Sequence, residues 1–180
     1  MKKIVLKSKR LVLRQAKVSD ANNFFRWIKD KEVIKYLTIQ RVKNLRQEKE
    51  YIKKTIKEKG RYFFSIVNED KILIGNTNLK LSEKNKKILL GIIIGEKDQW
   101  DKGYGTEAIK LLIDFVFGRL KYNRFELDVY KENRRAIKVY ERVGFKREGL
   151  KREAVISPVT KKYTDLIMMS ILKREWKPKK

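Results

Sequence analysis

The chain has 180 residues, of which 42% are hydrophobic, and this length predicts one domain with a single core over residues 1–180. It contains no cysteine and no histidine, which excludes thiolate nucleophiles, Cys/His zinc sites and Ser-His-Asp triads, and we expect no metal site. No segment reaches the roughly 20 apolar residues that a membrane span needs, so we expect a cytoplasmic protein without membrane contact.

The formal net charge is +25, from 47 Lys and Arg against 22 Asp and Glu. Such an excess favours an anionic partner, for example RNA, a ribosome surface or a polyphosphate cofactor. The lysines are nevertheless spread through every segment, and a composition bias of the genome explains this spread slightly better than an anionic partner does. Both interpretations stay open.

The first third of the chain predicts a strand followed by helices. Residues 3–15, KIVLKSKRLVLRQ, indicate the strand. A helix then begins with Ser19 or Asp20 as its N-cap. Residues 31–59 indicate one or two further helices, the last of which is stopped by Gly60.

Three strands follow, at residues 62–67, 71–81 and 86–94. The third strand has an unbroken apolar run, which is typical of a strand that is buried on both faces. A largely apolar helix is expected over residues 104–117, before a strand at 124–130. Since a strand, a crossover helix and a strand form one unit, the strands at 86–94 and 124–130 should be parallel, with a right-handed connection.

The last third of the chain predicts one more helix and a hairpin. The helix begins at Asn133 and ends at Gly144. Two strands, FKREGLKREAVI and KKYTDLIMMSIL, follow on either side of the turn SPVT. The predicted fold class is therefore α+β, with a mixed sheet.

Two glycines, Gly103 and Gly105, stand at the start of the helix 104–117. A backbone without Cβ atoms at a helix start lets a phosphate approach the free N–H groups and the positive end of the helix dipole. Lys102 precedes the glycines, which excludes a P-loop, and the eight residues 95–102 separate them from the strand, which excludes a dinucleotide fingerprint. Glycines that only ease the helix start remain the alternative.

The helix that begins at Asn133 carries a second sign of a ligand. Asn133 and Tyr140 are seven residues apart, so they share one helix face and lie roughly 10 Å apart along the axis. Ala136 lies between them and is too small to block an extended molecule. A lone Tyr140 is more often a core aromatic, but beside the glycine loop the pair favours a binding site.

Four ordered segments resemble the GNAT superfamily of acyl-CoA-dependent N-acetyltransferases, most closely its RimJ/RimL-type branch. They are LRQAKVSDA, GIIIGEKDQWDKGYGTEAIKLL, ENRRAIKVYERVGFKREG and YTDLIMMSILKREW. The phosphate loop of this family corresponds to residues 100–105, with Trp100 in place of the usual Gln or Arg and Asp101 in place of a usual Gly, and we expect Asp101 to point outward. The resemblance implies one N-acetyltransferase domain with three α/β/α layers and a mostly antiparallel sheet, whose one parallel β-α-β unit is splayed at the cofactor site.

The resemblance also implies that acetyl-CoA binds as co-substrate. Its pyrophosphate is expected on the N–H groups of the glycine loop, and its pantetheine arm along the end of the strand 86–94, where a backbone N–H near Ile94 holds the thioester oxygen. Asn133 hydrogen-bonds the pantetheine, and Arg134 or Arg135 reaches a phosphate. The full set expected to bind the cofactor is Ile92, Ile93, Ile94, Trp100, Lys102, Gly103, Tyr104, Gly105, Thr106, Asn133 and Arg135.

The implied chemistry is direct attack of an amine on the thioester through a tetrahedral intermediate, because no Cys is present and no Ser has an identifiable base. Tyr140 is expected to protonate the departing thiolate. Glu96 is expected to accept the proton of the amine through water, and Glu126 and Asp128 are the alternatives.

Three functions stay open: acetylation of a protein N-terminus, as in ribosomal proteins, acetylation of a small amine (polyamine, amino sugar or antibiotic), and a non-catalytic RNA-associated module. The first is favoured, because a charge of +25 repels small cationic substrates and favours docking on a ribosome or an acidic partner. We expect a monomer or a homodimer.

Overall fold

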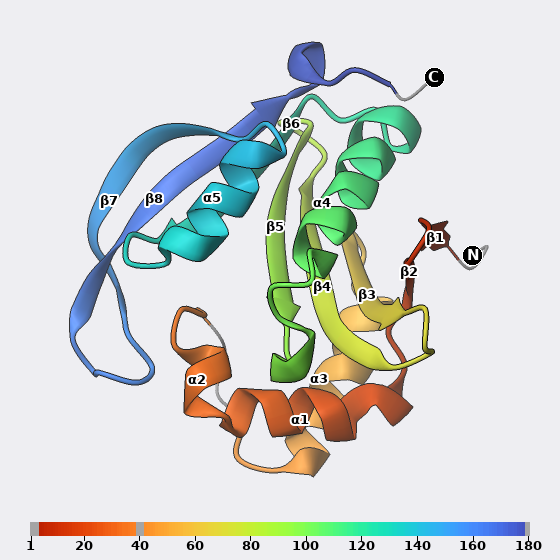
Figure 1. Cartoon of the computed structure of the whole chain (residues 1–180), viewed down its shortest axis with the longest axis vertical. Coiled ribbons are helices and arrows are strands. Elements are labelled where there is room, and N and C mark those ends of the chain that lie inside the picture. The colour runs from red at the N-terminus through yellow and green to blue at the C-terminus, as the bar shows by residue number, and fades with distance from the viewer. Residues whose placement is uncertain (1–3, 39–41, 179–180) are drawn as a thin grey trace.

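A computed structural model describes residues 4–38 and 42–178, and in these residues eight strands form a single mixed sheet (Figure 1). The strand order is β1-β2-β3-β4-β5-β6-β8-β7. The strands are β1 (Val5–Lys7), β2 (Leu11–Gln15), β3 (Arg61–Asn68), β4 (Leu73–Ser82), β5 (Lys87–Ile94), β6 (Arg124–Tyr130), β7 (Lys146–Ile156) and β8 (Tyr163–Leu172).

Only one neighbouring pair of strands in this sheet is parallel, β5 with β6, and every other pair is antiparallel. Their ladder covers Lys87, Ile88 and Leu89 against Arg124, Phe125 and Glu126. Beyond these residues the two strands separate, so the edge of residues 90–94 that faces β6 has no strand partner. The predicted splay of the β-α-β unit is thus confirmed.

The helices form two layers, one on each face of the sheet. They are α1 (Ala21–Lys29), α2 (Lys31–Ile34), α3 (Leu45–Lys57), α4 (Tyr104–Asp114) and α5 (Arg134–Arg142), and α4 continues into a π-helical turn (Phe115–Arg119). Short 3-10 turns lie at Val18–Asp20, Lys97–Gln99 and Lys173–Glu175. Figure 1 shows α1, α2 and α3 together at one end of the sheet and α4 and α5 along it.

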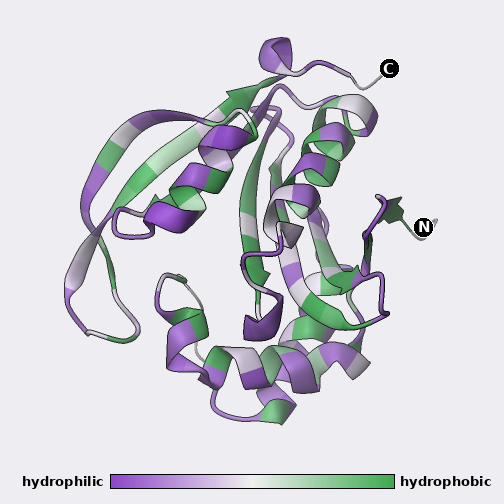
Figure 2. Ribbon diagram, in the orientation of Figure 1, coloured by the Kyte–Doolittle hydropathy of each residue, from purple (hydrophilic) through white to green (hydrophobic). Residues whose placement is uncertain are grey.

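Each helix layer has its own apolar core. The larger core packs α4 and α5 on the sheet through residues such as Leu112, Ile137 and Leu90. The smaller core joins α1 and α3 to β3 through Trp27, Ile52 and neighbouring residues. Figure 2 shows hydrophobic residues gathered on the central strands, whereas β7 is largely hydrophilic and exposed. The predicted α+β fold with three layers is therefore confirmed.

The prediction that residues 86–94 are buried on both faces is wrong. Ile88 and Leu90 are buried under α4, but Leu89 is 39% exposed and Gly91 is exposed as well. Successive side chains of a strand point to opposite faces, so Leu89, Gly91 and Ile93 share the second face, and of these Ile93 packs against the core of α1 and α3. Leu89 and Gly91 line an open space rather than a second core.

Other boundaries differ from the sequence predictions for local reasons. Residues 3–15 form two antiparallel strands, because Ser8 bonds to the backbone of Leu11 and turns the chain; residue 3 itself lies outside the described residues. The segment 31–59 contains two helices, and its residues 39–41 lie outside the described residues. The helix α3 ends at Lys57, three residues before Gly60. None of the helices in the described ranges is long and apolar enough to cross a bilayer.

Candidate active site

A cavity of about 680 Å³ opens where β5 and β6 separate. The strands contribute Gly91, Ile92, Ile93 and Val129 to its wall, and α5 contributes a second wall. The other side is formed by aromatic and polar side chains of α1, α3, β3 and β4, including Phe24, Trp27, Tyr51, Phe63 and Asn78. The cavity therefore contacts both helix layers, because the missing pairing between β5 and β6 leaves a passage through the sheet.

The wall from α5 is made of Asn133, Ala136 and Tyr140, the three residues that sequence spacing placed on one face. The Asn133 Oδ1 accepts from the N–H of Ala136 at 3.1 Å, so this side chain caps the helix. This leaves its amide N–H groups, for which no described residue serves as acceptor, available to a ligand.

Tyr140 lies one turn beyond Ala136, and its ring packs against Phe145 with 5.9 Å between ring centroids. Burial raises the pKa of Tyr140 to about 12, and no described residue hydrogen-bonds its hydroxyl. The hydroxyl therefore holds its proton at neutral pH, which is the state that a proton donor needs.

The N-terminus of α4 forms a second element beside the cavity. Gly103 is the N-cap, in a left-handed conformation with φ of +83°, and no side chain caps the helix. A Cβ at Gly105 has only the Ile94 Cγ1 within reach, at 3.9 Å, so the space in front of this residue is open. An uncapped helix start with open space in front of it fits a pyrophosphate, because the first N–H groups lack partners within the helix.

A side chain that sequence reasoning missed, Arg10, holds this loop in place. The Arg10 guanidinium donates to the carbonyl of Lys102 at 3.1 Å and to the carboxylate of Glu107. The same carboxylate also accepts from the Ser8 hydroxyl at 2.6 Å. The Arg10 guanidinium lies over the ring of Tyr104, 4.8 Å from the centroid. The turn between β1 and β2 is thereby tied to the first turn of α4.

The opposite side of the loop is tied to α5. Asp101 has a φ of +60° and pairs with Arg135 at 3.4 Å, with its side chain 78% exposed. The expectation that Asp101 points outward therefore agrees with the structure. Arg135 lies over the ring of Trp100, 4.9 Å from the centroid, and the Trp100 Nε1 donates to the carbonyl of Ile94 at 2.8 Å. These contacts link the loop, α5 and the end of β5.

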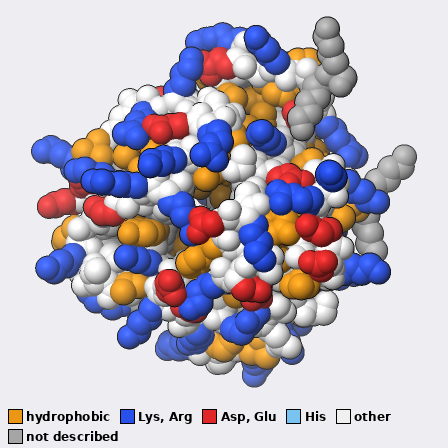
Figure 3. All heavy atoms as spheres, viewed as in Figure 1, with side chains coloured by type: hydrophobic (Ala, Val, Ile, Leu, Met, Phe, Trp, Pro, Cys, Tyr) orange, Lys and Arg blue, Asp and Glu red, His pale blue; other side chains and the backbone are white. Residues whose placement is uncertain are grey.

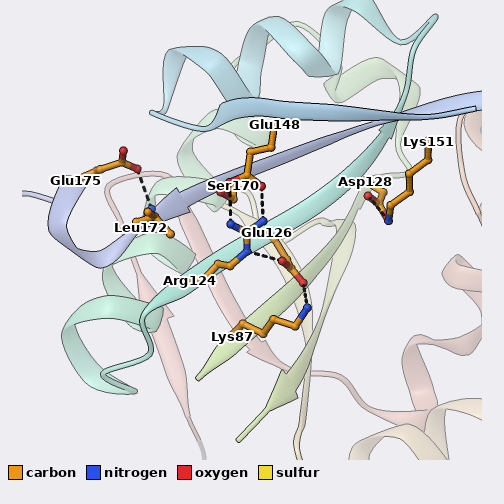
Figure 4. A network of polar contacts seen from close by, with 9 residues as sticks. All are labelled: Lys87, Arg124, Glu126, Asp128, Glu148, Lys151, Ser170, Leu172 and Glu175. Atoms are coloured by element: carbon orange, nitrogen blue, oxygen red, sulfur yellow. Dashed lines mark hydrogen bonds and ion pairs between the residues drawn. The ribbon is translucent and has the colours of Figure 1, made fainter. Parts of the chain in front are cut away.

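The three carboxylates considered as proton acceptors are all engaged in ion pairs. Glu96 accepts from Arg26 and from the Trp27 Nε1, and it lies outside the cavity lining. Glu126 pairs with Lys87 and Arg124 through separate oxygens, and Asp128 pairs with Lys151 at 2.8 Å (Figure 4). Burial alone would raise the pKa of Glu126, but the hydrogen bonds from Lys87 and Arg124 hold that pKa below its ordinary value. Of the three, only Asp128 contacts the cavity.

The carboxylate that sequence reasoning missed is Glu48, in the first turn of α3. It lines the cavity and is 5% exposed, and burial raises its pKa to about 7. A signal was present: Glu48, Ile52 and Thr55 have the spacing of one helix face, and the other two are buried. A charged residue on the buried face of an otherwise polar helix marks a candidate site.

The predicted site residues fall into three groups in the structure. Tyr140, Asn133, Ile92 and Ile93 line the cavity. Around the start of α4 and the end of β5, outside that lining, lie Ile94, Trp100, Lys102, Gly103, Tyr104, Gly105, Thr106 and Arg135. Glu96 stands apart, in its ion pair with Arg26. The described residues contain no group of three or more carboxylates arranged to hold a metal ion.

Lys and Arg side chains are spread over the face of the molecule shown in Figure 3 and do not gather in one patch. The face shown therefore offers no single basic docking surface. A ribosome or an acidic partner stays a prediction from composition.

The family model and the sequence relatives that match this chain are all described as acetyltransferases. Residues 10–146 match the family model of an acetyltransferase (GNAT) domain. The chain is 31% identical over 176 residues to an uncharacterized N-acetyltransferase, p20, of Bacillus licheniformis, which covers 95% of this chain and 97% of that protein. It is 27% identical over 163 residues to a probable N-acetyltransferase, YjcK, of Bacillus subtilis, covering 84% of this chain and 88% of that one.

Solved structures resemble the chain in fold. A GNAT-family acetyltransferase from Bacillus anthracis has a TM-score of 0.82 at 22% identity, covering 96% of this chain and all (100%) of that one. A spermidine N-acetyltransferase from Vibrio cholerae, solved with CoA and spermine, has a TM-score of 0.86 at 24% identity, covering 93% and 98%. At these identities the likeness shows the shared fold.

Proposed function

Because the chain belongs to the GNAT family of acetyltransferases, we propose that it acetylates a primary amine that carries one positive charge, with the N-terminal amine of a peptide or protein as preferred acceptor. The chain is an N-acetyltransferase, and the donor of this family is acetyl-CoA. The observation that carries the proposal is the cavity, which joins Asn133 and Tyr140 of α5 and the free end of β5 to a separate side built by α1 and α3. The RimJ/RimL-type branch stays a prediction.

The donor side supplies binding and proton donation. The N–H groups at the start of α4 bind the pyrophosphate, and Asn133 binds the pantetheine with its free amide protons. The unpaired edge of residues 90–94 supplies a backbone N–H for the thioester oxygen. Tyr140 then protonates the departing thiolate as the amine completes its attack.

The acceptor side favours one positive charge over several. Its lining carboxylates are Glu48 and Asp128, and Asp128 is already paired with Lys151. Lys80 lines the same cavity, as does Arg61, which pairs with Glu58 at 3.3 Å, so a second ammonium group meets the positive charge of Lys80 there. Polyamines, which carry several ammonium groups, fit this lining poorly.

An α-amine also suits the chemistry of the site. The α-amino group of a peptide has a pKa of about 8, whereas an alkyl amine such as that of Lys has one above about 10. Because Glu96, Glu126 and Asp128 are all ion-paired, the chain offers little assistance from these groups in removing a proton. An amine that is partly neutral at pH 7 to 8 needs the least assistance.

The test is a comparison of acceptors at a fixed concentration of acetyl-CoA, with released CoA as the readout. The panel contains a peptide with a free α-amine, the same peptide with that amine blocked and a Lys added, spermidine, and an amino sugar. We expect the highest kcat/KM for the free α-amine. A higher kcat/KM for spermidine or the amino sugar contradicts the preferred acceptor, and no turnover with any amine contradicts the proposed function as a whole.

A further inference from the structure

Glu48 is a buried carboxylate whose place in the fold is explained by local structure. Asn44 caps α3 by accepting from the N–H of Gln47 at 3.0 Å, which sets the start of the helix and turns Glu48 to the same side as Ile52. Ile52 is fully buried against α1, and Glu48, one turn earlier, reaches the cavity instead.

The carboxylate of Glu48 has no partner among the described residues: none donates a hydrogen bond to it, and no Lys or Arg pairs with it. A buried charge without a partner is costly, so proteins normally pair such groups. In this chain Glu96, Glu126 and Asp128 follow that rule. The absence of a partner for Glu48 therefore points to a positive charge that arrives with a ligand.

The surroundings of Glu48 define that ligand further. On its own helix, the hydroxyl of Tyr51 accepts from the Asn78 Nδ2 at 3.3 Å. Apolar and aromatic walls are supplied by Phe24, Trp27, Tyr36, Phe63 and Tyr130. Besides the tyrosines, the other titratable groups on the cavity wall are Arg61 from β3, which pairs with Glu58, Lys80 from β4, and the Asp128–Lys151 pair from β6 and β7. The tyrosines are Tyr36, Tyr51, Tyr130 and, from α5, Tyr140. Among the residues that the structure describes, the cavity thus offers one unpaired carboxylate, Glu48, within aromatic walls.

We propose that Glu48 determines acceptor specificity by binding the single ammonium group of an acceptor whose apolar or aromatic part packs against these walls. This inference rests on the proposed function, since it assigns the acceptor side of the same site. The carboxylate binds the cation only when ionised, so burial, which sets the pKa of Glu48 near 7, makes acceptor affinity depend on pH. An acceptor with further ammonium groups is disfavoured by Lys80 and, less strongly because it pairs with Glu58, by Arg61.

The test uses 2-phenylethylamine as the probe and isothermal titration of the whole chain saturated with CoA. The neutral analogue 2-phenylethanol has nearly the same shape, and spermidine represents a polycation. The variant is Glu48→Gln, and its matched control is Glu50→Gln, since Glu50 is exposed on the same helix and pairs with Lys53.

We expect Glu48→Gln to weaken binding of 2-phenylethylamine by about tenfold or more, as for a lost charge-assisted hydrogen bond, and Glu50→Gln to leave it within about twofold. Wild-type affinity should rise between pH 6 and pH 8, and the Gln variant should lose this dependence. The KM for acetyl-CoA should stay unchanged in both variants. A Glu48→Asp variant keeps the charge and should still prefer the amine over the alcohol.

Equal affinity of wild type and Glu48→Gln for 2-phenylethylamine overturns the inference, as does tighter binding of spermidine or failure of the wild type to bind the probe. A separate measurement tests the proposed function: acetyl-CoA should raise the Tm of any variant whose donor side is intact. A normal rise in Tm together with failed amine binding therefore rejects the role of Glu48 and leaves acetyl transfer standing. If Glu48→Gln does not fold, loss of the amine preference in Glu48→Asp overturns the inference.

Discussion

The proposed donor side and the proposed acceptor side of the site are built from different kinds of groups. The donor side consists of backbone groups at the start of α4 and along β5, and of residues on one helix, α5. The acceptor side consists of side chains from α1, α3, β3 and β4, far apart in sequence. A backbone site can bind the same group in every relative, whereas a side-chain site changes with each substitution. The acceptor is therefore the property that differs most readily between proteins of this fold.

The largest effect is expected where the two sides meet, at Tyr140. The variant Tyr140→Phe keeps the ring contact with Phe145 and removes only the hydroxyl. If the hydroxyl protonates the thiolate, kcat should fall by about a hundredfold or more, while the KM for acetyl-CoA changes little. Steady-state kinetics on an active amine measure both. Unchanged kcat with altered stability assigns Tyr140 to packing alone.

The next effect concerns the stability of the acceptor side. Burial raises the pKa of Glu48 from its ordinary value of 4.5 to about 7 in the folded chain. Between these two pH values the unfolded chain ionises Glu48 more readily than the folded chain, so the free energy of unfolding falls as pH rises from 4.5 to 7 and stays at the lower level above pH 7. Glu48→Gln removes this loss. We expect the variant to be more stable than wild type by about 3 kcal/mol at pH 8 and equal to it near pH 4.

Urea unfolding at both pH values measures this difference, and Glu50→Gln on the exposed face of α3 is the control. A Gln variant that is less stable than wild type at pH 8 shows that Glu48 has a stabilising partner. Loss of acceptor binding together with a gain in stability is the pattern expected of a residue whose partner is the ligand.

A third prediction tests the donor side through its glycines. In Gly105→Val the Cβ fits the free protein, since its nearest neighbour is the Ile94 Cγ1 at 3.9 Å, but it fills the space in front of the helix start. We expect stability close to wild type and acetyl-CoA binding weakened by about tenfold or more.

Gly103→Val provides the contrast, because a φ of +83° strains any residue with a Cβ and costs about 1–2 kcal/mol of stability. Thermal unfolding with and without acetyl-CoA separates the two effects. Normal acetyl-CoA affinity in Gly105→Val removes this loop from the donor site.

The smallest effect is expected at Asp101, where the loop carries an unfavourable charge for a pyrophosphate. In Asp101→Gly, the strain of the left-handed backbone at this position is removed, which stabilises the folded state. Glycine also raises the conformational entropy of the unfolded chain, which offsets this gain, so the free energy of unfolding should change by less than about 0.5 kcal/mol. The KM for acetyl-CoA should fall by about threefold as the carboxylate is removed. Asp101→Asn should show the same fall if charge is the cause; an unchanged KM in both variants places the phosphates elsewhere.

The local fold around the proposed donor side was largely predictable because its determinants are local. The strand, helix and strand between residues 86 and 130 follow from hydrophobic spacing, and Asn133 caps its helix through a contact three residues away. The glycine at position 103 can take its φ of +83° without the strain that a Cβ would bring. Such features depend on chain geometry within one or two turns, so a single sequence determines them.

The acceptor side was decided by tertiary structure. Glu96 pairs with Arg26, 70 residues away, Glu126 pairs with Lys87, and Asp128 pairs with Lys151. No local sequence pattern predicts which carboxylate forms an ion pair. Glu48, for which the described part of the chain offers no partner, looks like one more charge in a polar helix until α3 packs on the sheet and turns it into the cavity. Pairing and burial of charges depend on which elements meet in space, and that is set by the packing of the whole chain.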